Sequence, residues 1–294
     1  MEQLIAISIC YATGLEYGCK MGGIRSFRYK NIFGWILDEK KIIECEHVFR
    51  HPADLLNKPI KIFKKEGDKS TILIDAPVKN VGEDEKQWII KSSEAHSFFF
   101  KKIINRAQAK NSLVLIKHLS DLGLPVPRLY AYLWEKGKVD RYYLIAEGLY
   151  ESVNLALLER NQKERFSSLL DDGLVEKLVV ALATFHKNGY AHGDVKWSNI
   201  VILKNGNFRF VDVEHVKKPL GFFAQRLFVK DLARFLIAAQ EAGLDERDMT
   251  GIIKTYSVSR SLSQQKVVEE LRPQIKKLSI RKNLPLPGFI ENHI

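Results

Sequence analysis

The stretch LVEKLVVALATFHKNGYAHGDVKWSNIVILKNGNFRFVDVEHV, residues 174–216, decides the fold of this chain. Apolar residues recur at every third or fourth position in its first part, which predicts an amphipathic helix. After a short loop, the apolar runs 200–203 and 208–211 flank Asn205-Gly206, the dipeptide most typical of a tight hairpin. The sequence therefore predicts a helix, a polar loop and a β-hairpin in succession.

The polar residues of this stretch have the types and spacing that phosphoryl transfer requires. Such transfer depends on positioning and charge neutralisation rather than on covalent help from the protein. Asp194 in the loop can accept the proton of an acceptor hydroxyl, and Lys196 can reach the transferring phosphate. A hairpin would bring Asn199 and Asp212 together as oxygen ligands for Mg²⁺, a hard cation. A single loop aspartate is usually a turn or capping residue, but the four residues together favour a site.

These motifs resemble the protein-kinase-like superfamily, whose catalytic loop reads H-R-D-x-x-x-x-N and whose metal aspartate opens D-F-G. Here His192-Gly193-Asp194 precedes Asn199, and Asp212-Val213-Glu214 occupies the second motif. HGDVKWSN followed by D-x-E is most similar to the bacterial lipopolysaccharide kinase family, which phosphorylates Kdo or heptose sugars of the inner core. The resemblance implies an α+β, two-lobed protein-kinase-like fold with a small β-rich N-lobe and a mainly helical C-lobe, and ATP and Mg²⁺ as cofactors.

The resemblance also assigns nucleotide-binding positions outside the quoted stretch. Lys91 ends the predicted strand QWIIK and resembles the lysine that pairs ATP phosphates, with Lys101 and Lys102 as rivals. Glu147 and Leu149 follow a strongly apolar strand and resemble the hinge, where backbone groups bind adenine. Side-chain identity matters little at such a hinge.

Two features of the predicted N-lobe depart from protein kinases. The helix expected over residues 105–122 contains no glutamate to pair with Lys91, so either Glu94 substitutes or Lys91 works without the usual ion pair. The turn at 66–69, between β-like runs, stands where a phosphate-covering loop would lie, but it contains a single glycine.

Farther along the chain, the resemblance assigns support roles. Asp231, in a helix expected over 226–240, resembles the buried aspartate that braces the catalytic loop, and His192 is expected to be a buried support of that loop. The segment 219–225 is much shorter than an activation segment, which argues against a lobe that binds peptides and is switched by phosphorylation.

Length and composition fit two lobes. The chain has 294 residues, of which 46% are hydrophobic. We expect an uncertain leader over 1–24, an N-lobe over 25–146 and a C-lobe over 147–294, with Met21 as an alternative start. Three cysteines without a paired spacing suggest free thiols in a reducing compartment.

The net charge of +11 requires an anionic partner or surface. We expect a lipid-linked or core oligosaccharide as acceptor, and peripheral contact with an anionic membrane surface, for which the cations of region 101–117 are candidates. No recognised nucleic-acid motif is present, so no nucleic-acid partner is expected. Without a spanning segment or a convincing signal peptide, a cytoplasmic location is favoured, with peripheral attachment at the inner membrane.

Two other functions remain open from the sequence. A kinase for another small molecule or for protein would share the catalytic residues and differ only in its acceptor. A catalytically inactive nucleotide-binding scaffold is favoured by the missing helix glutamate and the poor glycine loop, and opposed by Asp194, Lys196, Asn199 and Asp212.

Overall fold

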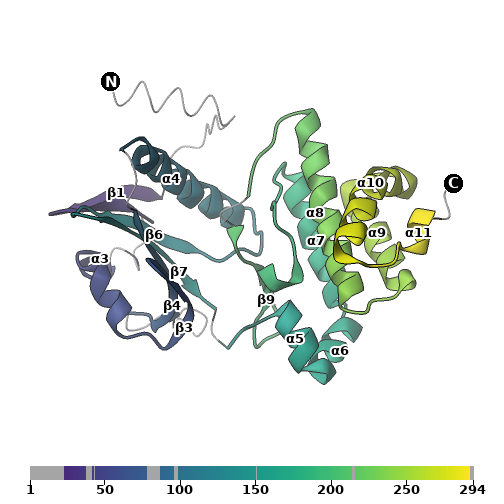
Figure 1. The fold of residues 1–294 in the computed structure, drawn as a ribbon, viewed down its shortest axis with the longest axis horizontal. Helices are drawn as coiled ribbons and strands as arrows, with labels where there is room; N and C mark the ends of the chain where they lie inside the picture. The colour runs from purple at the N-terminus through teal and green to yellow at the C-terminus, as the bar shows by residue number, and fades with distance from the viewer. Residues whose placement is uncertain are drawn as a thin grey trace. The chain divides into compact units, whose positions relative to one another are not determined.

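The structure is a computed structural model that describes residues 23–37, 42, 44–77, 87–95, 99–149, 151–213 and 216–291. The described chain divides into two compact units between Glu151 and Ser152 (Figure 1). The first is built on a β-sheet and the second is mainly helical, so the predicted α+β class is confirmed. The lobe limits 25–146 and 147–294 stay predictions, and most of the predicted leader lies outside the described residues.

The first unit contains an antiparallel sheet in the order β1-β2-β6-β7-β5-β4-β3. Its strands are β1 (Ile24–Tyr29), β2 (Ile32–Leu37), β3 (Lys61–Glu66), β4 (Lys69–Asp75), β5 (Gln87–Ala95), β6 (Leu129–Glu135) and β7 (Asp140–Gly148). The predicted turn at 66–69 is the tight connection between β3 and β4. The aromatic-rich segment after Arg25 forms the β1–β2 hairpin.

Two helices lie on opposite faces of this sheet (Figure 1). Phe49 of α3 (Glu46–Phe49) stacks on Trp88 of β5, with ring centroids 5.9 Å apart. Lys110 of α4 (Phe99–Asp121) lies over the ring of Trp35 in β2. The face under α4 also carries Lys91, because Trp35, Tyr132, Leu144 and Lys91 are direct cross-strand partners in turn and paired residues share a face.

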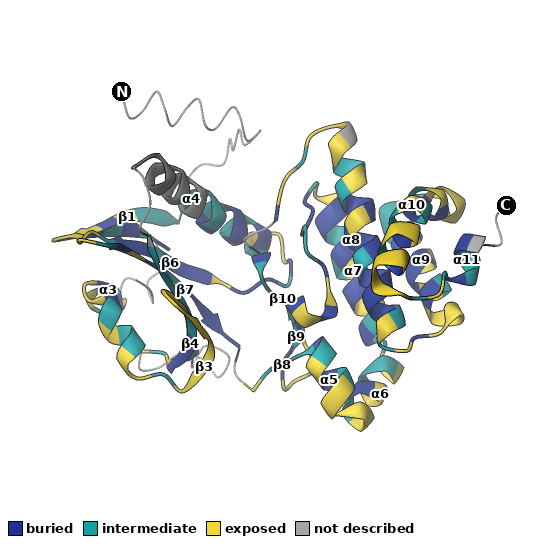
Figure 2. Cartoon of the chain, in the orientation of Figure 1, coloured by how far each residue is buried: buried dark blue, intermediate teal, exposed yellow. Residues whose placement is uncertain are grey.

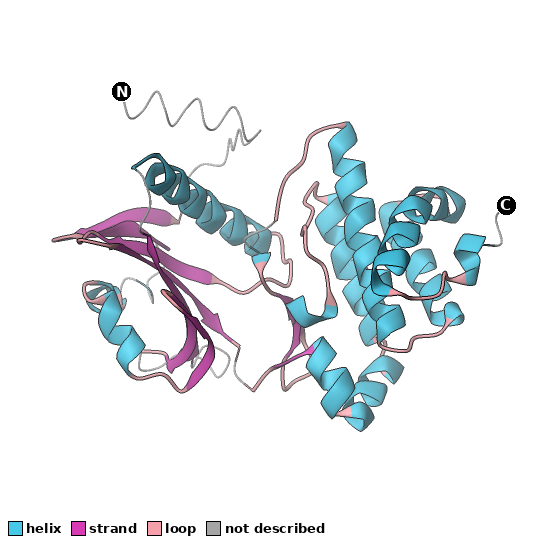
Figure 3. Cartoon of the chain, in the orientation of Figure 1, coloured by secondary structure: helices cyan, strands magenta, loops and turns pink. Residues whose placement is uncertain are grey.

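The second unit packs helices around the predicted catalytic stretch. Its elements are β8 (Val153–Asn154), α5 (Leu155–Asn161), α6 (Lys163–Asp171), α7 (Leu174–Lys187), the 3₁₀ turn η3 (Trp197–Asn199), β9 (Ile200–Ile202), β10 (Phe208–Phe210), α8 (Phe222–Glu241), α9 (Glu246–Arg260), α10 (Gln264–Lys282) and α11 (Gly288–Glu291). Figure 3 shows how largely helical this unit is. Its small sheet, in the order β10-β9-β8, contains the predicted hairpin.

Sequence signals explain the helix and hairpin that frame the loop. The apolar positions of α7, including Leu178, Leu182 and Phe185, are fully buried, so the period read from the sequence is that of its core face. In the hairpin, Gly206 adopts φ 79°, and the Asn205 side chain accepts a hydrogen bond of 3.0 Å from the Asn207 amide. The turn residues therefore perform the roles that their types predict.

Cys45 is the only cysteine among the described residues, and its thiol is buried and forms no disulfide there. Burial and the nearby charge of Glu44 raise its pKa to about 11. The remaining cysteines and Glu214 of the second motif lie outside the described residues.

Candidate active site

The loop between α7 and η3 contains Asp194 and, two residues before it, the fully buried His192. His192 is 0% exposed, and its ring lies against Phe185 of α7 and Phe210 of β10. Burial lowers the pKa of His192, with the charge of Asp231 opposing this effect. The enclosed imidazole packs within the loop, which confirms the expected burial of His192. Neither of its ring nitrogens has a hydrogen-bond partner within bonding geometry among the described residues, so the expected hydrogen-bonding support is not confirmed.

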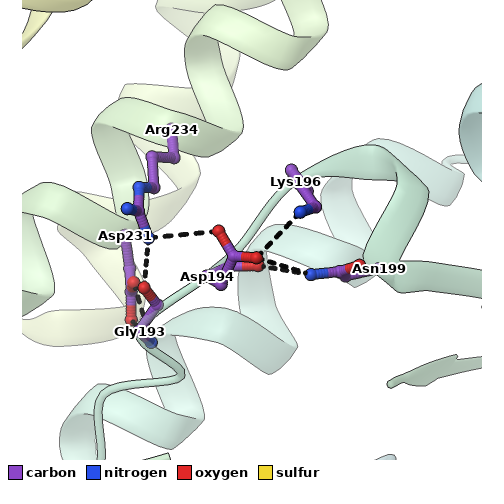
Figure 4. A network of polar contacts seen from close by, with 6 residues as sticks. All are labelled: Gly193, Asp194, Lys196, Asn199, Asp231 and Arg234. Carbon is purple, nitrogen blue, oxygen red and sulfur yellow. Dashed lines mark hydrogen bonds and ion pairs between the residues drawn. The ribbon is translucent and has the colours of Figure 1, made fainter. Parts of the chain in front are cut away.

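Three side chains hold the carboxylate of Asp194 (Figure 4). Lys196 Nζ lies 2.9 Å from Oδ2, and Arg234 Nη1 lies 3.3 Å from Oδ1. Asn199 Nδ2 donates to Oδ2 and to the backbone oxygen of Asp194, both at 3.0 Å. The carboxylate is therefore oriented from both of its oxygens before any substrate is bound.

These contacts keep Asp194 ionised. Partial burial of the side chain raises its pKa, but Lys196, through its hydrogen bond and charge, lowers it more strongly together with Arg234 and Asn199. The net result is a pKa below the usual value for aspartate. A carboxylate is the form that can accept a proton from a hydroxyl.

Helix α8 braces the loop from behind. Asp231 is fully buried, and both of its oxygens accept the amide hydrogen of Gly193, at 3.0 and 3.1 Å. One turn later on the same helix, Arg234 donates to the Gly193 carbonyl and also contacts Asp194 (Figure 4). The predicted bracing role of Asp231 is confirmed.

The sequence interpretation missed Arg234. Its signal was its spacing: a residue three positions after Asp231 on a helix lies on the same face and reaches the same neighbour. An arginine there adds a cation to Asp194 that the motif H-G-D-x-x-x-x-N does not contain.

A second buried network stands behind Asp231. The hydroxyl of Tyr256 and Nδ1 of His186 are 2.6 Å apart, and Nε2 of His186 lies 3.5 Å from Asp231 Oδ2. Burial lowers the pKa of His186, although the hydrogen bond and charge of Asp231 oppose this. The bracing aspartate therefore rests on a residue of α7 that is itself held by α9.

The hairpin brings the backbones next to Asn199 and Asp212 together. The Val211 amide donates to the Asn199 carbonyl at 2.9 Å, and Asp212 follows directly after it. Asp212 adopts φ 62°, the left-handed region, which costs about 1 kcal/mol for a residue with a side chain. Such strain next to a catalytic loop is typical of functional positions.

The donor types at the hairpin fit a hard divalent cation. Both hydrogen bonds that Asn199 makes to Asp194 use its amide nitrogen, which leaves the amide oxygen as the atom suited to Mg²⁺. Asp212 would add a carboxylate. Within the described ranges no cluster of three or more His, Cys, Asp and Glu side chains is arranged to hold a metal. The pairing of Asn199 and Asp212 on one ion stays a prediction.

In the first unit, Lys91 lies in the middle of β5 with its side chain half-buried. Its side chain faces the same side of the sheet as α4. Glu94 is three residues away and therefore projects from the opposite face, where it pairs with Arg141 at 2.7 Å. Strand geometry thus argues against Glu94 as the substitute partner for Lys91, and the described helix α4 contains no glutamate.

Of the predicted hinge residues, Glu147 is the second-last residue of β7 and Leu149 directly follows the strand. Glu147 is buried, and its amide donates to the Arg128 carbonyl at 2.9 Å while its carboxylate accepts from the Arg128 amide at 3.0 Å. The Glu147 side chain therefore fixes the neighbouring backbone. Leu149 is also buried. The adenine-binding role of both residues stays a prediction.

A family model described as "Lipopolysaccharide kinase (Kdo/WaaP) family" matches residues 86–256, more than half of the chain. The protein belongs to this family. It is therefore a lipopolysaccharide kinase by family, and the match contains both Lys91 and the whole catalytic stretch. Comparison with curated protein sequences gives no match.

A solved structure, "WaaP in complex with acyl carrier protein", resembles this lipopolysaccharide kinase with a TM-score of 0.55 and 15% sequence identity. The similarity covers 78% of this chain and 90% of the other. It confirms the two-part, protein-kinase-like fold. In the part of the chain that the structure describes, no helix combines the length and apolar character needed to cross a bilayer.

Proposed function

We propose that this lipopolysaccharide kinase transfers the γ-phosphate of ATP to a hydroxyl of a Kdo or heptose sugar in the lipopolysaccharide inner core. The observation that carries the proposal is the ionised carboxylate of Asp194, held from both oxygens by Lys196, Asn199 and Arg234. Family membership supplies the reaction class and the kind of acceptor.

Asp194 orients the acceptor hydroxyl and accepts its proton as the oxygen attacks phosphorus. The two oxygens are fixed by separate partners, so the acceptor meets a carboxylate of defined orientation, which lowers the entropic cost of reaching the reactive geometry. Lys196, whose side chain is 50% exposed, is free to turn from Asp194 toward the transferring phosphate. Its charge then opposes the charge that builds up on the phosphate oxygens.

The remaining assigned residues bind the nucleotide. Lys91 pairs with ATP phosphates, and backbone groups of Glu147 and Leu149 bind adenine. Asn199 and Asp212 hold Mg²⁺, which when bound neutralises phosphate charge and orients the leaving group. Asp194 is the proton acceptor and is not assigned as a ligand of the metal. Its three partners are the side chains of Lys196, Asn199 and Arg234.

A transfer assay with labelled ATP tests this proposal. Purified inner-core oligosaccharide is expected to accept label in a Mg²⁺-dependent reaction, whereas generic protein substrates and other small alcohols accept little. Label on protein alone would favour the alternative of a protein kinase. Binding of ATP without any transfer or hydrolysis would favour the inactive scaffold.

The cellular counterpart is the mass of the lipid A-core isolated with and without the active chain. We expect one additional phosphate only where the wild-type chain is present, and none where it is replaced by Asp194→Asn. An unchanged mass would exclude the inner core as acceptor.

A further inference from the structure

The segment that enters α8 is tied at both ends to the loop that carries Asp194. At its start, Lys217 and Ala191 exchange two backbone hydrogen bonds of 2.9 Å each, next to the catalytic loop. At its end, α8 supplies Asp231 and Arg234 to Gly193 and the carboxylate. The segment is therefore connected to the catalytic loop through contacts on both sides of it.

Two large apolar side chains project from this segment into solvent. Leu220 is 65% exposed and Phe223 is 68% exposed. Figure 2 shows exposed residues along the chain that leads into α8. Single exposed apolar residues are ordinary on a protein surface. These two, however, lie within three positions of each other where the chain enters α8, so one short stretch carries both.

The charged residues within this part of the chain have one sign. Residues 216–230 contain four cations and no aspartate or glutamate; the cations are Lys217, Lys218, Arg226 and Lys230, all exposed. The acid contacting this stretch from a packed neighbour is Glu270 of α10, which accepts a hydrogen bond from Gln225. We call the exposed residues of this stretch the basic-apolar segment; they are Lys217, Lys218, Leu220, Gly221, Phe223, Arg226 and Lys230.

Exposed apolar side chains bordered by lysine and arginine fit the interface of an anionic bilayer. The apolar groups enter the boundary between headgroups and acyl chains, while the cations remain at the level of the headgroup phosphates. An anionic bilayer offers both kinds of contact side by side, phosphates for the cations and the acyl-chain boundary for Leu220 and Phe223.

The cations first expected at the membrane are partly engaged elsewhere. Lys117 forms an ion pair of 2.8 Å with Asp121 on the same helix, and Lys110 lies over Trp35. The basic-apolar segment carries exposed apolar groups in addition to its charge, which region 101–117 does not show in its described side chains.

We propose that the basic-apolar segment inserts into the surface of an anionic membrane and thereby presents Asp194 to a sugar that is anchored in that membrane. This inference rests on the proposed function for the identity of the acceptor, but the binding itself does not. A lipid-anchored sugar lies close to the headgroups, and Phe223 precedes Asp231 by eight residues of α8, about 12 Å along the helix, so docking through this segment holds the second unit at the surface where the acceptor is anchored.

Vesicle flotation with the full chain tests the proposal. Vesicles of phosphatidylethanolamine and phosphatidylglycerol contain neither ATP nor acceptor, so binding is measured apart from catalysis. The variant Leu220→Ser/Phe223→Ser should bind at least about tenfold more weakly than wild type, and wild type should bind phosphatidylcholine vesicles weakly. Lys217→Gln/Lys218→Gln should also weaken binding, because two positive charges are lost. The bonds to Ala191 should persist in this variant, because they use only the backbone of Lys217.

Val258 and Ile280 provide the matched control, since they are 73% and 81% exposed on α9 and α10. Val258→Ser/Ile280→Ser should bind vesicles like wild type. The proposal would be overturned if all the variants bound the vesicles as well as wild type does, or if only Val258→Ser/Ile280→Ser bound more weakly. Thermal unfolding of each variant verifies that it folds.

Transfer assays separate this inference from the proposed function. Leu220→Ser/Phe223→Ser should phosphorylate soluble, deacylated core oligosaccharide at the wild-type rate and vesicle-anchored acceptor at least about tenfold more slowly. Equal rates on both acceptors would overturn the membrane role. Absence of transfer by wild type to either acceptor would contradict the proposed function and leave vesicle binding to be judged by flotation.

Discussion

The catalytic loop and the β3–β4 hairpin differ sharply in how the protein holds them. The loop rests on fully buried groups, and Asp194 has three side-chain partners. Every residue of β3 is exposed, and the strand lies at the edge of its sheet. If this hairpin covers nucleotide phosphates, its conformation depends on the nucleotide, whereas the loop is organised in advance. We infer that Asp194 is held in its working orientation before substrates bind, whereas the β3–β4 hairpin can change its conformation when a nucleotide binds.

Substitution of the bracing aspartate should produce the largest effect on this difference. Asp231→Asn places an amide donor against the Gly193 amide hydrogen in a fully buried site. We expect the free energy of unfolding to fall by about 2 kcal/mol, because a buried hydrogen bond is lost and a polar group is left without a partner. Urea denaturation measures this.

Asp171→Asn, at an exposed site on α6, is the control and should change the free energy of unfolding by less than about 0.5 kcal/mol. Equal stability of the Asp231 and Asp171 variants would contradict the claim that α8 braces the loop. A loss of stability in both would point to general sensitivity of the helical unit.

Removal of the arginine should change the pH dependence of transfer. Arg234 helps to lower the pKa of Asp194, so Arg234→Met should raise that pKa toward its usual value. The carboxylate is the active form, and activity is lost as pH falls through its pKa. The acidic limb of kcat/KM should therefore move to higher pH in the variant.

Lys254→Met removes an exposed cation from α9 and should leave the acidic limb in place. Profiles measured on soluble core oligosaccharide avoid any contribution from membrane binding. Identical limbs for wild type and Arg234→Met would show that Arg234 does not act on Asp194.

A smaller effect is expected from the imidazole behind Asp231. Burial lowers the pKa of His186 below its usual 6.5. The unfolded chain then takes up a proton that the folded chain refuses, so stability is complete above pH 6.5 and falls as pH drops below it. His186→Gln should make the unfolding free energy less steep between about pH 5 and 6.5, with His192 supplying part of the remaining slope. An unchanged slope would exclude His186 as a contributor.

The smallest effect should come from the exposed hairpin. Ile62 and Phe63 are 54% and 51% exposed, so Ile62→Ser and Phe63→Ser should each change the free energy of unfolding by less than about 0.5 kcal/mol. Hydrogen exchange should be faster in β3 than in β5, and ATP should slow it in β3. Protection of β3 equal to that of β5 without nucleotide would remove the difference between the two regions.

Local sequence patterns were sufficient for α7 and the hairpin, whereas the bracing role of Asp231 was predicted from the resemblance to the protein-kinase-like superfamily. The apolar period of α7 and the turn residues Asn205-Gly206 act over a few positions, so their structure follows from neighbouring residues. The order of the sheet and the side of it that Lys91 faces depend on pairings between distant strands, which a single sequence does not contain. Arg234 could have been predicted from its spacing to Asp231.

Other expectations needed strand geometry to be judged. Glu94 was one of two explanations for the missing helix glutamate, and only the alternation of β5 places it on the opposite face from Lys91. The predicted helix at 105–122 begins earlier, at Phe99, because periodicity does not define where a helix starts.

The transfer rate of Asp194→Asn tests the central claim most directly. With labelled ATP, Mg²⁺ and soluble core oligosaccharide, kcat should fall by about 10²- to 10⁴-fold relative to wild type, since an amide cannot accept the hydroxyl proton. The melting temperature should change little, because the side chain is partly exposed and an amide fills the same space. Turnover within a few-fold of wild type, in a variant that is folded and binds ATP, would contradict the assignment of Asp194 as the base.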